Sequence, residues 1–422
     1  MTAFMAIFSI LPNPVHASFT IKPTYDSPLA LVLDAKIDSG EILSPSSSEH
    51  WESEIREQLS YLQGHLGFYG AAPQRKEFQI HITGSQPYAA DPSLMRVTYE
   101  AVGRISWAKQ WNLETELETI LPARGDEAGL QAFYAKYLSL CSGDKNTEFG
   151  TFFYYFYPAQ DHCPLNKPSA DQAGWAVRFP MHLSVSAENT QGKFPEYGKI
   201  WEDGWLKVTA VFGMSDEGGG GDWGVKGYNE FFRQLKREYG NPIALSEPFG
   251  GDPGEAHPVL SLQFRQPYGM IQVDVRLIHS LQSIDADFAQ WFQLHAPESD
   301  VVYYGGHAGY GNNVEALTQL ARFKRGIYQI YFVNGCDTFT HLSTSLFDGS
   351  AAANPGFAGS KYLDVLTNAF SSYFDKGPGE IMAVLRAMKD KNQTYSQILQ
   401  PLDSRPERIV EGEQDNNWPR PF

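Results

Sequence analysis

The strongest constraint on the fold is a strand–helix–strand pattern in the last third of the chain. Over 299–309, an apolar run ends on two glycines and is followed directly by His307. Over 328–338, a second apolar run ends on one glycine and is followed by Cys336. Between them, apolar residues recur every three or four positions over 314–323, which predicts a crossover helix. Such a unit is right-handed and its strands are parallel, so both carboxyl ends should lie at one edge of the sheet.

Cysteine and histidine at one sheet edge point to nucleophilic chemistry. A thiol attacks well once a base takes its proton, and imidazole supplies that base while backbone amides stabilise the oxyanion. Each residue alone has an ordinary explanation: His307 as a hydrogen-bonding loop residue, and Cys336 as a small buried filler. Their pairing at one predicted edge favours catalysis, or descent from a catalyst.

The order of histidine and then cysteine, each after an apolar strand, resembles the caspase, gingipain and clostripain group of cysteine peptidases. The matching stretches are 305–309 and 334–338, and His307 and Cys336 are 336 − 307 = 29 residues apart. The resemblance extends over about 205–391. It implies a caspase-like fold and a peptidase that cleaves peptides or proteins through a Cys-His dyad, with no cofactor and no metal.

The resemblance also implies an oxyanion hole made by the backbone N–H groups of Ala308 and Cys336. In the family a glycine usually follows the histidine, and here that residue is Ala308, so its backbone must adopt a conformation open to alanine. The caspase QACxG signature is absent. Both differences from the family pattern weaken the expectation of activity more than the expectation of the fold.

Substrate selection is expected from the same edge of the sheet. The resemblance implies that Gly306, Asp222 and Asp337 shape the pocket for the residue before the cleaved bond, with Asp216 and Glu217 nearby. These carboxylates would favour a basic side chain, and a solvated acidic loop or a cation site explains them equally well. The glycine-rich loop after strand 205–212 lacks both GxGxxG spacing and a P-loop ending, and its acids would repel phosphate.

Two rival functions remain open. The first is a non-catalytic binding or scaffold protein that kept the sheet and lost the chemistry. The second is a metal-dependent hydrolase that uses His279, His307 or His341, although the chain has no HExxH motif. A serine hydrolase has less support, because the chain has no GxSxG motif.

Strands alternate with helices from residue 201 to the end, which predicts a doubly wound, mostly parallel α/β sheet. Within this second domain we expect a loop over 345–360, a helix over 363–374 and an edge strand near 408–416. The first domain, 18–200, has the order strand, helix, strand, strand, helix, strand of a ferredoxin-like split unit. Its aromatic run at 151–157 is expected to be a buried strand, with the floor of a binding groove as the alternative.

Length and charge limit the partners. A chain of 422 residues suggests two or three domains. The formal net charge of −16 argues against nucleic acid and against an anionic membrane surface as partners. We also expect no stable membrane insertion, since the apolar stretch at 3–11 is too short to span a bilayer.

The first 17 residues have the apolar core and small-residue ending of a signal peptide, without the usual basic start. This favours a periplasmic or secreted protein, with a cytoplasmic one as the alternative. The chain has three cysteines. In an exported chain, Cys141 and Cys163 could pair and leave Cys336 free; the alternative is three reduced thiols.

Overall fold

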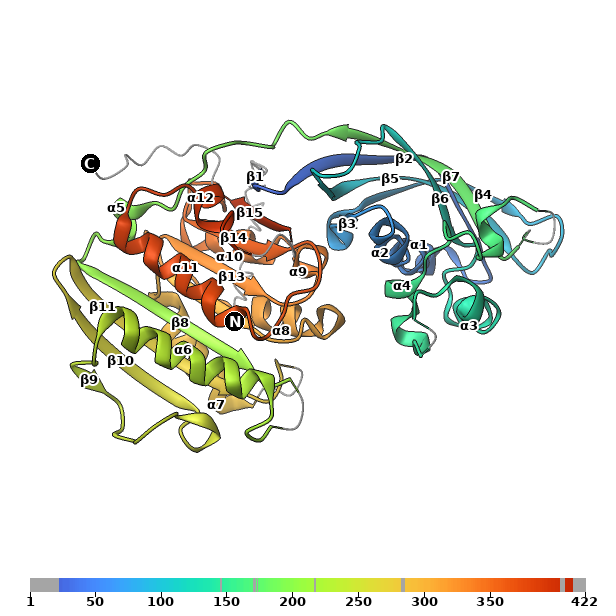
Figure 1. The fold of residues 1–422 in the computed structure, drawn as a ribbon. Helices are drawn as coiled ribbons and strands as arrows, with labels where there is room; N and C mark the ends of the chain where they lie inside the picture. The colour runs from blue at the N-terminus through green and yellow to red at the C-terminus, as the bar shows by residue number, and fades with distance from the viewer. Residues whose placement is uncertain are drawn as a thin grey trace, which may run out of the picture.

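The structure, a computed structural model, describes residues 23–144, 146–169, 172, 174–215, 218–281, 285–402 and 407–412. The predicted signal peptide, 1–17, lies outside the described residues. Figure 1 shows two sheets side by side: a large one built mainly from the second half of the chain, and a smaller, curled one from the first half.

The large sheet has nine strands in the order β1-β15-β14-β13-β12-β8-β11-β10-β9. The five central strands, from β14 to β11, are parallel, and the strands flanking them on both sides pair antiparallel. The strands are β1 (Thr24–Asp26), β8 (Trp205–Gly213), β9 (Ala244–Leu245), β10 (Val259–Gln266), β11 (Gly269–Ile278), β12 (Val301–Gly305), β13 (Gln329–Asn334), β14 (Leu363–Asn368) and β15 (Arg408–Gly412).

Helices cover both faces of this sheet, so its central strands are apolar on both sides. In β12, Tyr303 packs into the core on one face, while Val302 and Tyr304 pack into the core on the other. The helices of this half are α5 (Tyr197–Ile200), α6 (Trp223–Tyr239), α7 (Ala286–His295), α8 (Asn312–Leu320), α9 (Thr338–His341), α10 (Ser345–Ala353), α11 (Gly377–Asp390) and α12 (Tyr395–Leu399).

An α/β fold with a helix-covered sheet is confirmed, but the sheet is mixed rather than mostly parallel. The helix predicted over 363–374 is wrong, because its apolar half is the fully buried strand β14 between β13 and β15. The loop predicted over 345–360 contains helix α10. The last strand, β15, is not at the edge, since β1 pairs beyond it. The caspase-like assignment stays a prediction.

The smaller sheet has the order β3-β5-β2-β7-β6, with β4 also paired to β5. It curls around helices α1 to α4 (Figure 1). Its strands are β2 (Ala30–Ser44), β3 (Ala71–Pro73), β4 (Gln79–Pro87), β5 (Met95–Ala108), β6 (Glu116–Pro122) and β7 (Ala176–Val185), and its helices are α1 (Trp51–Ser60), α2 (Leu62–Gly67), α3 (Glu127–Cys141) and α4 (Phe152–Tyr155).

The ferredoxin-like order is present only in part. Strand β5 pairs antiparallel between β2 and β4, as a split unit requires. The strand on the other side of β2 is β7, and β3 and β6 are additional strands. The run at 151–157 is not a strand. It contains α4, because Phe152 and Phe156 are four residues apart and both enter the core on one side.

The predicted disulfide is present. Cys141 and Cys163 are bonded, and Cys336 is free. The bond ties the end of α3 to the loop that follows α4. The backbone N–H of Tyr157 also donates to the carbonyl of Cys141 over 2.8 Å, so the aromatic segment is fixed to α3 at two neighbouring points.

Candidate active site

His307 and Cys336 follow neighbouring strands of the large sheet. Strands β12 and β13 are adjacent and parallel, with Gly305 opposite Asn334. Each residue therefore lies two positions beyond a strand end at the same edge. The sheet prediction is confirmed, and the two side chains line one cavity of about 800 Å³.

The hydrogen bond of His307 identifies which ring nitrogen is free. Its Nε2 lies 2.9 Å from the carbonyl oxygen of Ser215. Because a carbonyl only accepts, Nε2 carries the hydrogen, and the neutral ring keeps its lone pair on Nδ1. The ring of Phe374 packs edge-on against the imidazole, with 4.9 Å between centroids. The side chain is otherwise exposed, so Nδ1 is a base open to solvent.

The peptide bond after His307 is fixed by two donors. The hydroxyl of Tyr304 and the Nδ2 of Asn313 each donate to the His307 carbonyl over 2.7 Å. In a trans peptide the N–H points away from the carbonyl, so these bonds also set the direction of the Ala308 N–H. Ala308 has φ −68° and ψ −21°, a conformation that needs no glycine. Alanine at the position of the expected glycine therefore causes no backbone strain.

Gly335 lets the two strand ends approach closely. A Cβ at this position would lie 2.9 Å from the Gly306 carbonyl oxygen and 3.2 Å from the Ala308 nitrogen. Any larger residue would push the two loops apart. Within the described residues, the N–H groups of Ala308 and Cys336 have no hydrogen-bond acceptor, so both remain free to bind an oxyanion.

The Cys336 thiol is partly buried beneath Ser371 and Ser372. Its Sγ donates a weak hydrogen bond to the Ser372 carbonyl over 3.7 Å. Burial, and then the charge of Asp337, raise the pKa of the thiol, although hydrogen bonds from the two serines partly oppose the shift. The thiol is therefore protonated at neutral pH and needs a base when it attacks.

The two predicted substrate carboxylates have different surroundings. Asp337 lines the cavity, and burial raises the pKa of its carboxyl from 3.8 to about 7. Asp222 is instead the N-cap of α6, where its carboxylate accepts hydrogen bonds from the N–H groups of Gly224 and Val225 over 2.7 and 3.0 Å. It is buried and is not among the residues that line the cavity. Its observed role is to hold a helix end.

The other residues predicted to bind substrate contribute no charge that the structure places in the cavity. Gly306 lies beside the cavity wall, where a Cβ would contact the Tyr304 hydroxyl at 2.7 Å. It therefore permits close packing of the strand end, and it lines a smaller neighbouring cavity. Asp216 and Glu217 lie outside the described residues.

A buried polar network supports the end of β13, and the sequence did not reveal it. The Nδ2 of Asn334 donates to Glu380 over 2.6 Å, and Glu380 forms an ion pair with the buried Arg408. Asn368 donates to the Asn334 side chain over 2.8 Å and to the Gly335 carbonyl over 3.0 Å. This network holds the turn that leads into Cys336. Its only sequence signal was an asparagine at the end of both β13 and β14.

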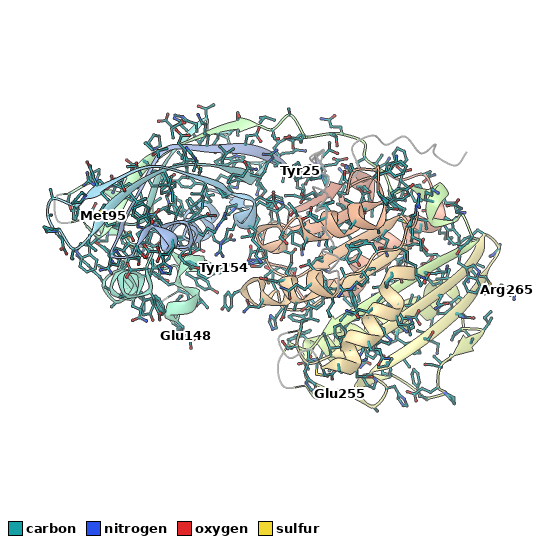
Figure 2. The ribbon with its side chains drawn as sticks, turned by 180° about the vertical axis from the view of Figure 1, so that it is seen from behind. Tyr25, Met95, Glu148, Tyr154, Glu255 and Arg265 are labelled. Atoms are coloured by element: carbon teal, nitrogen blue, oxygen red, sulfur yellow. A yellow bond between two sulfur atoms is a disulfide. The ribbon has the colours of Figure 1, made fainter. Side chains whose placement is uncertain are left out.

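One wall of the cavity comes from the other half of the molecule. Tyr154, Tyr155 and Tyr157 line it together with His307 and Cys336. The Tyr154 hydroxyl is hydrogen-bonded to Nε2 of His341, and its ring packs edge-on against Tyr310 with 5.3 Å between centroids. Figure 2 shows Tyr154 where the two halves of the molecule meet. The groove alternative for this aromatic segment therefore describes its position better than the buried strand does.

The histidines proposed for a metal-dependent hydrolase are not grouped as ligands. His279 and His307 line the same cavity, but His341 is bonded to Tyr154, and burial lowers its pKa to about 3. In the described part of the chain, no three or more His, Cys, Asp or Glu side chains are arranged to hold a metal ion.

Comparisons with known proteins do not assign the chain to a family. No protein-family model matches the chain, and no curated protein matches it. Among the helices of the described ranges, none combines the length and apolar character needed to cross a bilayer. Any function assigned to the chain therefore depends on the geometry of its own residues.

Proposed function

We propose that this chain is a cysteine peptidase of the caspase, gingipain and clostripain type, acting through His307 and Cys336. The observation that carries the proposal is their position beyond the ends of adjacent parallel strands, on one cavity. Two features add support: a histidine whose Nδ1 is free, and two backbone N–H groups without an acceptor in the described residues.

In the proposed reaction, Nδ1 of His307 takes the thiol proton as Sγ of Cys336 attacks the peptide carbonyl carbon. The carbonyl oxygen becomes an oxyanion bound by the N–H groups of Ala308 and Cys336. The imidazolium then gives its proton to the leaving amine, and the C–N bond breaks to leave a thioester. Water, deprotonated by His307, attacks the thioester, releases the acid and restores the thiol.

A basic side chain before the cleaved bond fits the cavity. Asp337 supplies a carboxylate, and the tyrosines on the opposite wall supply aromatic faces that attract cations. The pKa of Asp337 is about 7, so we expect cleavage after Lys or Arg to strengthen as the pH rises through 7 and the carboxylate ionises. A bound cation would extend that ionised range to lower pH.

The disulfide supports a periplasmic or secreted location, because such bonds persist in oxidising compartments. We therefore propose export of the chain. Fractionation of producing cells tests this: a protein found only in the cytoplasm, with Cys141 and Cys163 reduced, would contradict it.

The test is a peptide-library digest with the purified full chain, its Cys336→Ala variant and its His307→Gln variant. We expect the wild type to cleave and both variants to fall to background, with unchanged thermal unfolding. The matched control is His279→Gln, since His279 lines the same cavity but has no role in the proposed mechanism. Its variant should cleave normally.

Other outcomes favour other functions. Cleavage that persists in Cys336→Ala and disappears in His279→Gln and with a chelator would support a metal-dependent hydrolase. No cleavage by the wild type, together with no labelling of Cys336 by peptidyl electrophiles, would leave a binding or scaffold protein.

A further inference from the structure

A second cavity, of about 600 Å³, lies between the two halves of the molecule. Arg56, Arg75 and Lys76 line it from the first half, and Tyr310, Thr340 and His341 line it from the second. Tyr310 also lines the cavity of His307 and Cys336, so the two spaces are neighbours. The mechanism proposed above uses none of these six residues.

Arg75 is the unexplained residue of this cavity. Its guanidinium lies over the ring of Phe153, with 4.7 Å to the centroid, and burial lowers its pKa. It forms no hydrogen bond and no ion pair with any described residue. The charge of Glu57 opposes this shift, but no ion pair joins Glu57 and Arg75 in the described residues. Five N–H donors without an acceptor in a partly buried site are costly unless a ligand or water binds them.

The neighbouring cations do have partners. Arg56 is paired with Glu52 over 2.7 Å, and Lys76 is paired with Glu315 over 2.6 Å across the two halves. Arg75 therefore differs from them in having its charge uncompensated at contact distance.

The second half of the molecule places no positive charge beside Arg75. Thr340 lines the cavity, but its side-chain oxygen is fully buried and out of reach of a ligand. Its neighbour His341 is neutral at physiological pH, because burial and the charge of Arg75 both lower its pKa.

We propose that this cavity binds an oxyanion, a carboxylate or a phosphate group, on the Arg75 guanidinium. The planar fork of arginine matches the two oxygens of such a group. A carboxylate at Glu57 or Glu315 does not compete for Arg75 at contact distance. The site needs neither Cys336 nor His307, so it stands whether or not the chain is a peptidase.

The experiment is calorimetric titration of the full chain at constant ionic strength, with chloride as the balancing anion. One arm uses inorganic phosphate, and the other uses the N-acetylated, C-terminally amidated glutamate residue as the carboxylate probe. Tight binding of phosphate alone assigns the site to phosphate groups, and binding of the glutamate probe assigns it to carboxylates.

The variants are Arg75→Gln, Arg75→Lys and the control Arg265→Gln. Arg265 is an exposed arginine far from this cavity (Figure 2). We expect Arg75→Gln to weaken binding about tenfold or more, because charge-assisted hydrogen bonds are lost. Arg75→Lys keeps the charge but loses the planar fork, so it should weaken binding by a smaller factor, and Arg265→Gln should bind like the wild type.

Three results would overturn the proposal: no binding of either probe by the wild type, equal binding by Arg75→Gln, or an equal loss in Arg265→Gln. Thermal unfolding without ligand checks that each variant is folded. If Arg75→Gln does not fold, Arg75→Lys decides, and unchanged binding by that variant removes the site as proposed.

Discussion

Asp337 follows the candidate nucleophile and has an environment that disfavours its charge. It has φ 52°, in the left-handed region, and burial raises the pKa of its carboxyl from 3.8 to about 7. Asn tolerates this backbone conformation almost as well as Asp and has the same size. The substitution Asp337→Asn therefore removes the titration with little other change.

The magnitude follows from the shift in pKa. The folded and unfolded values differ by about 3 units, and each unit corresponds to about 1.4 kcal/mol, so the effect is roughly 4 kcal/mol. The folded protein holds this proton more tightly than the unfolded chain does. The free energy of unfolding is therefore highest below pH ~4 and falls as the pH rises to about 7. In Asp337→Asn this fall is absent.

Urea unfolding with the disulfide intact, at steps between pH 4 and 8.5, measures the effect. Glu411 has its pKa raised to about 8 by burial, which gives a second fall of the same sign in both proteins. The test is therefore the difference between wild type and Asp337→Asn at each pH. Parallel curves would refute the reasoning, since they would mean that Asp337 titrates alike in folded and unfolded chains. The exposed residue Asp161, changed to Asn, is the control and should follow the wild type.

Three further substitutions test the support of the site. Asn313→Ala removes a hydrogen-bond donor from the His307 carbonyl, so the Ala308 N–H is held less firmly in the oxyanion hole. Peptide hydrolysis should show kcat about tenfold lower with little change in KM. An unchanged kcat contradicts this positioning role. Glu380→Gln removes the carboxylate that pairs with the buried Arg408 and should lower the free energy of unfolding by roughly 3 kcal/mol in urea; a loss under ~1 kcal/mol argues against it. Cys163→Ser opens a loop whose ends are 22 residues apart and should cost about 3 kcal/mol, and an unmoved urea midpoint would contradict this.

The sequence predicted best where the signal was local. Strands β12 and β13 are continuous apolar runs that stop at glycines, and the helix between them has the helical period, so their pairing and shared edge followed. The hairpin of β10 and β11 has a similar local signal, since two alternating runs lie a few residues apart. The candidate pair was found because these local features fix where each strand ends.

The sequence did not predict features that depend on contacts between residues far apart in the chain. The run Leu363–Asn368 suits a helix as well as a strand until β13 and β15 are present on either side of it. The contact of Asn334 with Glu380 joins residues 46 apart, and that of Glu380 with Arg408 joins residues 28 apart. The tyrosine wall comes from α4 and the residues just after it, in the other half of the molecule. No periodic pattern encodes such contacts, because they arise when separate elements pack together.

Residues with a strained backbone are concentrated at the candidate site, which argues that the strain serves a function there. Three non-glycine residues of the described chain have positive φ, and two of them, Tyr310 and Asp337, line the cavity of His307 and Cys336. Each left-handed residue costs about 1 kcal/mol, and strain of this kind persists where the surrounding structure holds a residue in place.

Tyr310→Gly tests this argument. Relief of strain at φ 53° is offset by the greater freedom of glycine in the unfolded chain, and the tyrosine is half exposed, so the free energy of unfolding should change by less than ~1 kcal/mol. Loss of the ring that packs on Tyr154 should nevertheless lower kcat/KM for peptide cleavage, because the wall of the cavity is loosened. Urea unfolding and hydrolysis rates measure the two effects. A variant that is much less stable but cleaves normally would show that the strained tyrosine serves folding instead.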